Sequence, residues 1–150
     1  MAQEFALHRL LEIAATQAET AAANLGELNR QLRQHEEKLL LLFKYRDDYQ
    51  ERLRRASKAG LDGAGLRNFH DFLDRLEQAI LQQHALVVGA RTHVESGLGD
   101  WRVKQRKSKA FDTLSQRFQV AARHGETTRE QKVQDEFASR ANRGKSHPRR

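Results

Sequence analysis

The chain has 150 residues, of which 31% are charged and 7% aromatic, and it contains one proline and no cysteine. This composition favours long helices over a thick globular core, and it excludes disulfides, thiol catalysis and cysteine-based zinc sites. No apolar run of about 18 residues suggests a transmembrane helix, and the N-terminus lacks the basic and apolar regions of a signal peptide, so we expect a cytoplasmic protein.

The formal net charge of +7 is unevenly distributed along the sequence. Residues 1–60 hold 10 Lys/Arg and 9 Asp/Glu, residues 61–100 hold 3 and 6, and residues 101–150 hold 14 and 5. The excess positive charge therefore lies in the last third of the chain. Such asymmetry concerns the choice of partners more than the fold.

The first predicted element is a helix over residues 5–57. Apolar residues recur at alternating steps of four and three, which is typical of a helix that faces another helix in a left-handed coiled coil. His35 and Arg46 are the polar exceptions; we favour a role in setting the register between the helices, with a pH switch at His35 as the alternative. The stripe consists of Leu7, Leu11, Ala14, Ala18, Ala21, Leu25, Leu28, Leu32, His35, Leu39, Leu42, Arg46, Tyr49, Leu53 and Ala56.

A turn is predicted near residues 57–65, with 58–65 as its extent, because three glycines fall within six residues. Gly60 suits the left-handed C-terminal cap of the first helix, and Asp62 suits the N-cap of the next. No Glu follows Asp62 by three residues, so the capping box is incomplete.

A second helix is predicted over residues 66–141, again with steps of four and three. After Trp101 its stripe continues less regularly through Phe111, Leu114 and Phe118, which should meet Leu11 and Leu7. The regular part consists of Phe69, Leu73, Leu76, Ile80, Gln83, Val87, Ala90, Val94, Gly97 and Trp101.

Two apolar stripes joined by a short turn predict an all-α fold, a long antiparallel two-helix coiled-coil hairpin over residues 1–141. With the turn near residue 61, the numbers of facing residues should add to about 122. This register places Trp101 against the small side chains of Ala18 and Ala21. Beyond about residue 122 the second helix should overhang, and residues 142–150 should form a disordered basic tail.

Catalytic motifs are missing from the sequence. The seven histidines are scattered, and neither an HExxH pair nor a phosphate-binding GxxxxGK loop occurs. A pair of helices also offers no cleft that could enclose a reaction. We therefore expect no enzyme, no small-molecule substrate, no metal and no cofactor.

More apolar residues lie near the turn than the single seam between two helices needs. A two-helix rod cannot cover the two edges that they form at the same height, and an exposed apolar patch suggests a binding site. A wider core or self-association is the alternative. The edges are formed by Leu42, Tyr45 and Tyr49 on the first helix and by Phe72, Leu76, Ala79 and Gln83 on the second.

The basic C-terminal third has three possible explanations. It is a solvated helix face, a nucleic-acid-binding surface, or a surface for a protein partner with an acidic socket. Beyond Phe111 and Phe118, which the seam uses, no aromatic residues interleave the basic ones in a stacking pattern. We therefore favour a protein partner over nucleic acid.

The sequence resembles the FliJ family of flagellar export proteins over about residues 1–141. The resemblance rests on five blocks: residues 5–7 (FAL), 44–50 (KYRDDYQ), 66–69 (LRNF), 107–114 (KSKAFDTL) and 131–138 (QKVQDEFA).

This resemblance implies a monomeric cytoplasmic component of the flagellar type III export apparatus, similar to the γ stalk of rotary ATPases and held at the inner membrane only through protein partners. Its hairpin ends would enter and stimulate the ring of the export ATPase, with Arg9, Arg117 and Arg123 as contacts chosen for their position and charge. A patch nearer the turn would bind the cytoplasmic domain of the export-gate protein FlhA, and export chaperones are further partners. The implied gate contacts are Leu42, Tyr45, Tyr49, Phe72, Leu76 and Ala79; Lys38 and Gln83 end the same stripes, where the family has Gln and His.

Two other classes of function stay open at this point. One is a structural coiled-coil scaffold that dimerises through the apolar patch. The other is a basic nucleic-acid-binding protein, whose affinity would fall steeply with salt.

Overall fold

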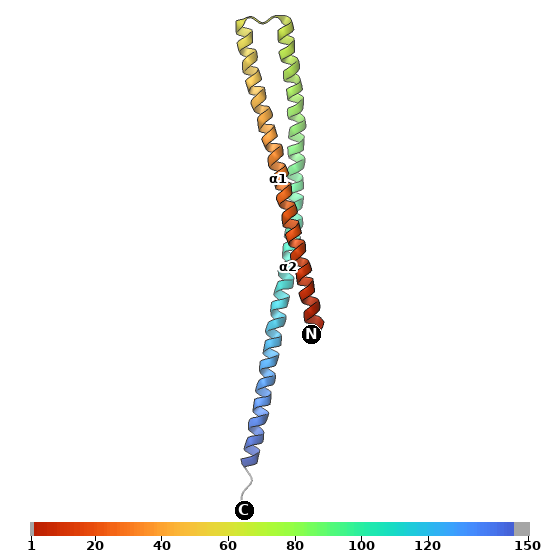
Figure 1. Cartoon of the computed structure of the whole chain (residues 1–150), viewed down its shortest axis with the longest axis vertical. Coiled ribbons are helices and arrows are strands. Elements are labelled where there is room, and N and C mark those ends of the chain that lie inside the picture. Colours follow the sequence, from red (N-terminus) through yellow and green to blue (C-terminus); the bar gives the residue numbers. More distant parts are fainter. Residues whose placement is uncertain (1, 146–150) are drawn as a thin grey trace, which may run out of the picture. The chain divides into compact units, whose positions relative to one another are not determined.

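The computed structural model describes residues 2–145, which form two long helices joined by a three-residue turn (Figure 1). Helix α1 comprises Ala2–Ala59 and helix α2 comprises Gly63–Lys145. The predicted all-α fold is confirmed, and no strand occurs in the described part of the chain. Neither helix contains, within those residues, an apolar stretch that could cross a lipid bilayer.

The turn consists of residues 60–62, inside the predicted segment 58–65. Gly60 has a φ of 97°, the left-handed conformation that commonly follows a helix C-terminus. The Asp62 carboxylate accepts a 2.7 Å hydrogen bond from the Gly65 N–H, and its carbonyl accepts one of 3.0 Å from the Leu66 N–H. Both predicted caps are therefore confirmed, and α2 begins three residues before the predicted start at residue 66 because Asp62 caps it there.

At its other end α2 continues through Lys145, past the predicted end at residue 141. Residues 142–145, which we assigned to a disordered tail, are helical. This segment contains Gly144 but no proline, and a single glycine costs a helix only about 1 kcal/mol. The remainder of the predicted tail, residues 146–150, lies outside the described residues.

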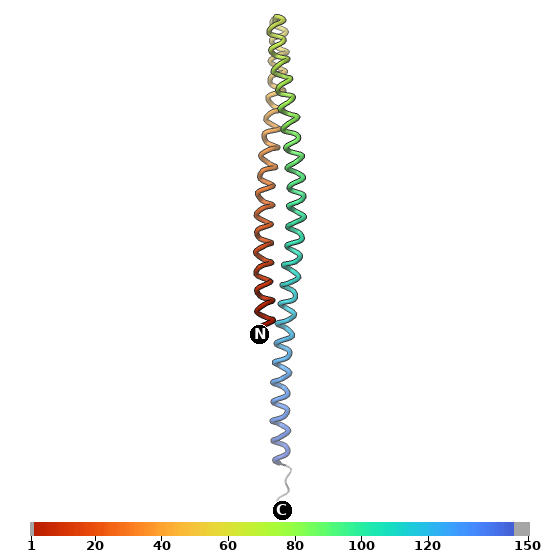
Figure 2. Tube along the Cα trace, turned by 90° about the vertical axis from the view of Figure 1, so that its right-hand side faces the viewer, coloured from red at the N-terminus to blue at the C-terminus, as the bar shows by residue number. Residues whose placement is uncertain are grey.

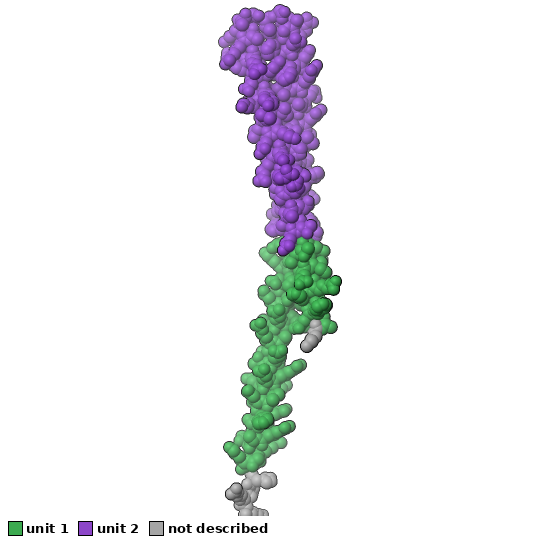
Figure 3. All heavy atoms as spheres, in the orientation of Figure 1, with its two compact units in different colours: residues 1–17, 105–150 green, residues 18–104 purple. Residues whose placement is uncertain are grey.

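The chain divides into two compact units (Figure 3). Unit 2 comprises residues 18–104 and contains the turn, whereas unit 1 comprises residues 1–17 and 105–150.

In unit 2 the two helical arms run antiparallel along each other (Figure 2). Its buried apolar side chains are Ala18 and Ala21 of α1 and Leu76, Ile80 and Val87 of α2. The α1 stripe residues between 18 and 56 are all buried or half-buried, as the heptad spacing predicts. The core is thus a narrow seam between the arms.

Contacts between the arms agree with the predicted register. The Tyr49 ring lies 5.0 Å from the Phe69 ring and 4.2 Å from the Phe72 ring, measured between centroids. Further from the turn, a Cβ atom placed on Gly97 would lie 2.7 Å from Leu28 Cδ1 and 3.6 Å from Leu25 Cδ1. Gly97 therefore marks the place where the absence of a side chain lets the leucines of α1 pack against the α2 backbone.

In unit 1 the first turns of α1 lie beside residues 115–119 of α2. An open groove of about 220 Å³ is lined by Glu4, Leu7, His8, Ser115, Phe118 and Gln119. The expected pairing of Leu114 with the first helix is wrong: Leu114 is 50% exposed, and Ser115 takes the seam position because the heptad continues through Phe111, Ser115 and Phe118. Every described residue from Gln116 onward is exposed.

Candidate protein-interaction surfaces

Two different edges flank the seam of unit 2 near the turn. Residues seven apart on a coiled-coil helix lie above one another, so each edge is formed by one such line from each arm. The first edge combines the α1 line through Glu36 and Phe43 with the α2 line through Glu77, His84 and Arg91.

The first edge is held by ion pairs between the arms. Arg46 Nη1 lies 3.5 Å from Glu77 Oε1, and Arg91 Nη2 lies 3.6 Å from Glu36 Oε1. The Arg46 guanidinium also lies 5.1 Å from the centre of the Phe43 ring. The aliphatic part of the Arg46 side chain thus lies along the seam and its guanidinium faces this edge, as predicted for a polar seam residue.

The second edge is apolar and aromatic. Its α1 line passes through Tyr45, and its α2 line passes through Phe72 and Ala79. Tyr45 is 51% exposed and Phe72 is 43% exposed, while Tyr49 is half-buried between the rings of Phe69 and Phe72. Phe72 is held by its ring contact with Tyr49 and is still open to solvent, as is Tyr45. Exposed aromatic side chains are typical of the centre of a protein interface.

The six residues expected from the resemblance to contact the gate lie on this second edge or in the seam beside it, and we call them the apolar patch: Leu42, Tyr45, Tyr49, Phe72, Leu76 and Ala79. The structure exposes them unequally. Leu42 and Ala79 are half-buried, but Leu76 is only 8% exposed. Leu76 therefore belongs to the seam and supports the apolar patch from beneath, because its position in the heptad points it at α1.

Sequence analysis missed one exposed residue beside the apolar patch. Leu86 is 52% exposed and follows Ala79 by seven residues, so it continues the same line of α2. Leu41, which the sequence placed off the stripe, is 46% exposed on the α1 side of this edge. The seven-residue spacing from Phe72 through Ala79 to Leu86 is the signal that could have identified Leu86.

A polar link crosses the seam next to the apolar patch. The Gln83 side-chain amide donates a 2.9 Å hydrogen bond to the His35 carbonyl and lies 3.3 Å from His35 Nδ1. Gln83 therefore bonds to the backbone of the opposite arm, which only one register of the two helices allows. This geometry agrees with the register-setting role predicted for His35.

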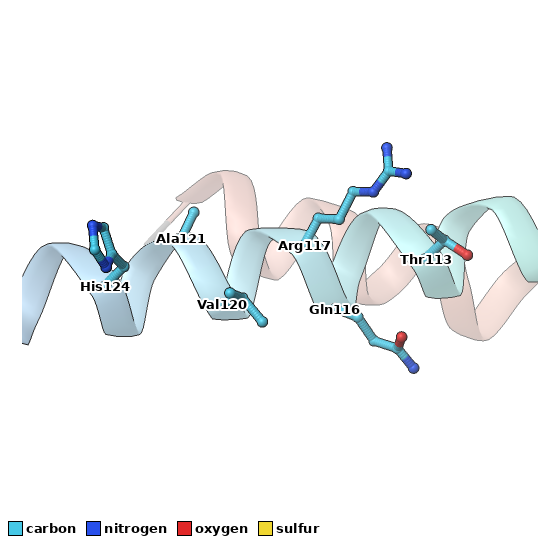
Figure 4. A pocket seen from close by; sticks show the side chains of 6 residues that line it. All are labelled: Thr113, Gln116, Arg117, Val120, Ala121 and His124. Carbon is cyan, nitrogen blue, oxygen red and sulfur yellow. The ribbon is translucent and has the colours of Figure 1, made fainter.

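The arginines expected to contact the ATPase lie on exposed faces of unit 1. Arg9 is on α1, and Arg117 and Arg123 are on the α2 segment that extends to residue 145. Arg117 projects from the same side of α2 as Ala121 and His124 (Figure 4). These three residues line a shallow groove of about 540 Å³ together with Thr113, Gln116 and Val120. Arg9 and Arg123 are not among the residues that line this groove.

Ion pairing distinguishes the basic residues of the two units. Unit 2 pairs Arg30, Arg46, Arg54, Arg55, Arg91 and Lys104 with nearby carboxylates. In the described part of unit 1, Arg143 aside, no Lys or Arg side chain pairs with a carboxylate. The other described Lys and Arg side chains of unit 1 are therefore available to a partner.

Metal binding has no candidate among residues 2–145. No group of three or more His, Cys, Asp or Glu side chains in this range could hold a metal ion. The surfaces described above offer apolar contact and charge, which are means of recognising a protein.

Comparison with known proteins gives one consistent result. The family model described as "Flagellar FliJ protein" matches residues 3–146. A protein named "Flagellar FliJ protein" from Escherichia coli (strain K12) is 36% identical over 141 residues, which cover 94% of this chain and 96% of the relative. A protein of the same name from Salmonella typhi is 37% identical over 142 residues, with the same coverage.

Proposed function

Because the chain belongs to the FliJ family of flagellar proteins, we propose that it joins the export ATPase of the flagellum to the export gate. In this proposal the ends of the hairpin enter the ATPase ring and raise its activity. The apolar patch binds the cytoplasmic domain of FlhA at the inner membrane. Contact with export chaperones is compatible with the same surfaces.

The ATPase-binding role rests on the unpaired cations of unit 1. The last third of the sequence holds 14 Lys/Arg against 5 Asp/Glu. In the described part of unit 1, no Lys or Arg side chain other than that of Arg143 pairs with a carboxylate of the chain. From Gln116 onward the described α2 residues are also exposed, so their side chains are open to solvent. A long helix with free cations suits insertion into a pore lined by carboxylates, because charge steers binding without requiring one fixed contact.

The gate-binding role rests on the apolar patch. The exposed rings of Tyr45 and Phe72 sit on one edge of the seam, away from the ion pairs that hold the other edge. Burying such rings in a partner contributes more free energy than rim contacts do. Each proposed partner thus has a separate surface, so one chain could hold both at once.

The ATPase role is tested by measuring ATP turnover of the flagellar export ATPase while this chain is titrated into the assay. We expect a saturable rise in turnover. Arg117→Glu with Arg123→Glu should require a higher concentration of the chain for the same rise, because two attractions become repulsions. Arg33→Glu with Arg67→Glu makes the same charge change in unit 2 and should leave the titration unchanged. A flat titration with an ATPase that forms hexamers would remove this role.

The gate role is tested with Tyr45→Ala combined with Phe72→Ala. This variant should lose binding to the FlhA cytoplasmic domain, measured by calorimetry, while its helical content, measured by circular dichroism, stays the same. Both side chains are substantially exposed, so their truncation costs the fold little. If the variant loses helicity, the two rings serve the seam and the gate assignment fails.

A further inference from the structure

Two free cations bracket the apolar patch along α1. Lys38 precedes Tyr45 by seven residues and Arg52 follows it by seven, so all three lie on one line at the second edge of the hairpin. Seven residues of helix rise about 10.5 Å, which places the two cations about 21 Å apart with the tyrosine between them.

The opposite arm gives these cations no counter-charge. The α2 line on the same edge consists of Phe72, Ala79 and Leu86, none of which is charged. On the other edge, by contrast, Glu77 and Arg91 occupy the α2 line and pair with Arg46 and Glu36 across the seam. Ion pairs between the two helices therefore occur on one edge, whereas the α2 line of the other edge offers its cations no carboxylate.

Neighbours on the same helix also leave the two cations free. Within residues 2–145 neither Lys38 nor Arg52 makes an ion pair or a side-chain hydrogen bond, and Asp48, four residues before Arg52, is not paired with it. Lys38 and Leu41 line an open groove of about 330 Å³ together with Gln34 and Glu37. A cation and an exposed leucine therefore border one hollow beside the apolar patch.

We propose that Lys38 and Arg52 form a two-point electrostatic clamp, which takes a partner surface with an apolar centre and carboxylates at both ends. This proposal rests on the gate-binding role proposed above and adds the charge pattern of the surface that the apolar patch recognises. The apolar centre would bury the rings of Tyr45 and Phe72. The clamp would fix the direction of the hairpin along the partner, because charges at the rim of an interface set orientation and association rate more than total affinity.

The test is the affinity of the FlhA cytoplasmic domain for this chain, measured at low and at high salt. Lys38→Glu and Arg52→Glu should each weaken binding several-fold, and the double variant should weaken it about tenfold or more at low salt. The charge-preserving variants Lys38→Arg and Arg52→Lys should keep the affinity. The loss should shrink at high salt, because screening removes the attraction from the original chain as well.

Arg33→Glu is the matched control, since Arg33 is exposed, makes no ion pair in the described structure, and lies off the second edge. It should bind like the original chain. If Phe72→Ala loses binding while the double reversal binds normally, the clamp is wrong and the gate role stands. If Phe72→Ala binds normally, the apolar patch is not the contact and both proposals fail.

Discussion

Single residues at the turn decide where each helix stops and starts. Gly60 takes a positive φ that closes α1, and the Asp62 carboxylate accepts a hydrogen bond from the Gly65 N–H in the first turn of α2. Gly65 is part of the same device, because a Cβ atom there would lie 2.6 Å from Leu61 Cδ1 and 2.9 Å from Asp62 Oδ1. Gly65 stands where a capping box would have Glu, and its lack of a side chain leaves room for Leu61 and the Asp62 carboxylate.

Replacing Gly65 with alanine should destabilise the hairpin by about 1–2 kcal/mol, the usual value of an N-cap, because the methyl group displaces Leu61 or the Asp62 carboxylate. The free energy of unfolding in urea, followed by circular dichroism, measures the change. Gly63→Ala is the control: its Cβ atom meets nothing within 4 Å, so it should be neutral or add about 0.4–1 kcal/mol. Equal effects of the two substitutions would contradict the steric account.

Among residues 2–145, Glu51 is the carboxylate whose pKa is moved furthest from its ordinary range. Hydrogen bonds from Arg54, above all, and then from Arg55 lower its pKa from 4.5 to about 2. Since the folded chain favours the charged form, its contribution to stability is present above pH 4.5 and is lost as the pH falls towards 2. NMR titration should place the Glu51 pKa near 2.

In an Arg54→Gln variant the Glu51 pKa should move back towards 4.5. Glu27, whose pKa is lowered by Arg30, is the internal control and should titrate as before. An unchanged Glu51 titration in this variant would mean that Arg54 does not hold the carboxylate in solution.

At the scale of the helices, α2 contains glycines with opposite roles. Gly97 is buried against Leu28, whereas a Cβ atom on Gly99 would meet nothing within 4 Å. The first glycine is needed for close packing of the arms, and the second only weakens the helix. Gly97 and Gly99 lie within one helical turn, so a substitution by alanine at each position allows a direct comparison.

Gly97→Ala should destabilise unit 2 by about 1–3 kcal/mol, because its methyl group would lie 2.7 Å from Leu28 Cδ1 and force the leucine or the arm to move. Gly99→Ala should instead stabilise the helix by about 0.5–1 kcal/mol. Thermal unfolding of the two variants in parallel measures both effects. A stabilised Gly97→Ala protein would show that Leu28 has another rotamer available.

Heptad spacing predicted the seam of unit 2 well, because burial along a coiled coil follows directly from the register of apolar residues. It failed at Leu114: we expected this leucine to face α1 because it is apolar, but the heptad places Ser115 in the seam instead. It also missed the end of α2, since an exposed helix has no apolar pattern to mark where it stops. The division of charges between the two edges depends on which side chains meet across the seam, so the spacing along one helix could not reveal it.

At the scale of the whole molecule, charge argues against self-association. The chain carries a formal net charge of +7, and copies of a strongly charged protein repel one another. The apolar stripes are also used within the chain, since α1 and α2 cover each other in unit 2. A scaffold that dimerises through the apolar patch would have to overcome this repulsion.

Sedimentation equilibrium should therefore give a mass of 17.3 kDa over a wide range of protein concentration. A doubled mass that Tyr45→Ala with Phe72→Ala abolishes would instead favour the scaffold. A doubled mass that persists in this variant would place the contact elsewhere.

The three-residue turn also has a consequence for how the hairpin forms. Closing a loop costs more entropy the longer it is, so contacts beside the turn, such as that between Tyr49 and Phe69, are the least expensive to make first. Each contact that forms between the helices shortens the loop that the next contact must close. Pairing of the helices then propagates from the turn towards Leu25 and Gly97. The rings that we assign to the gate would on this view also be among the first to meet when the chain folds.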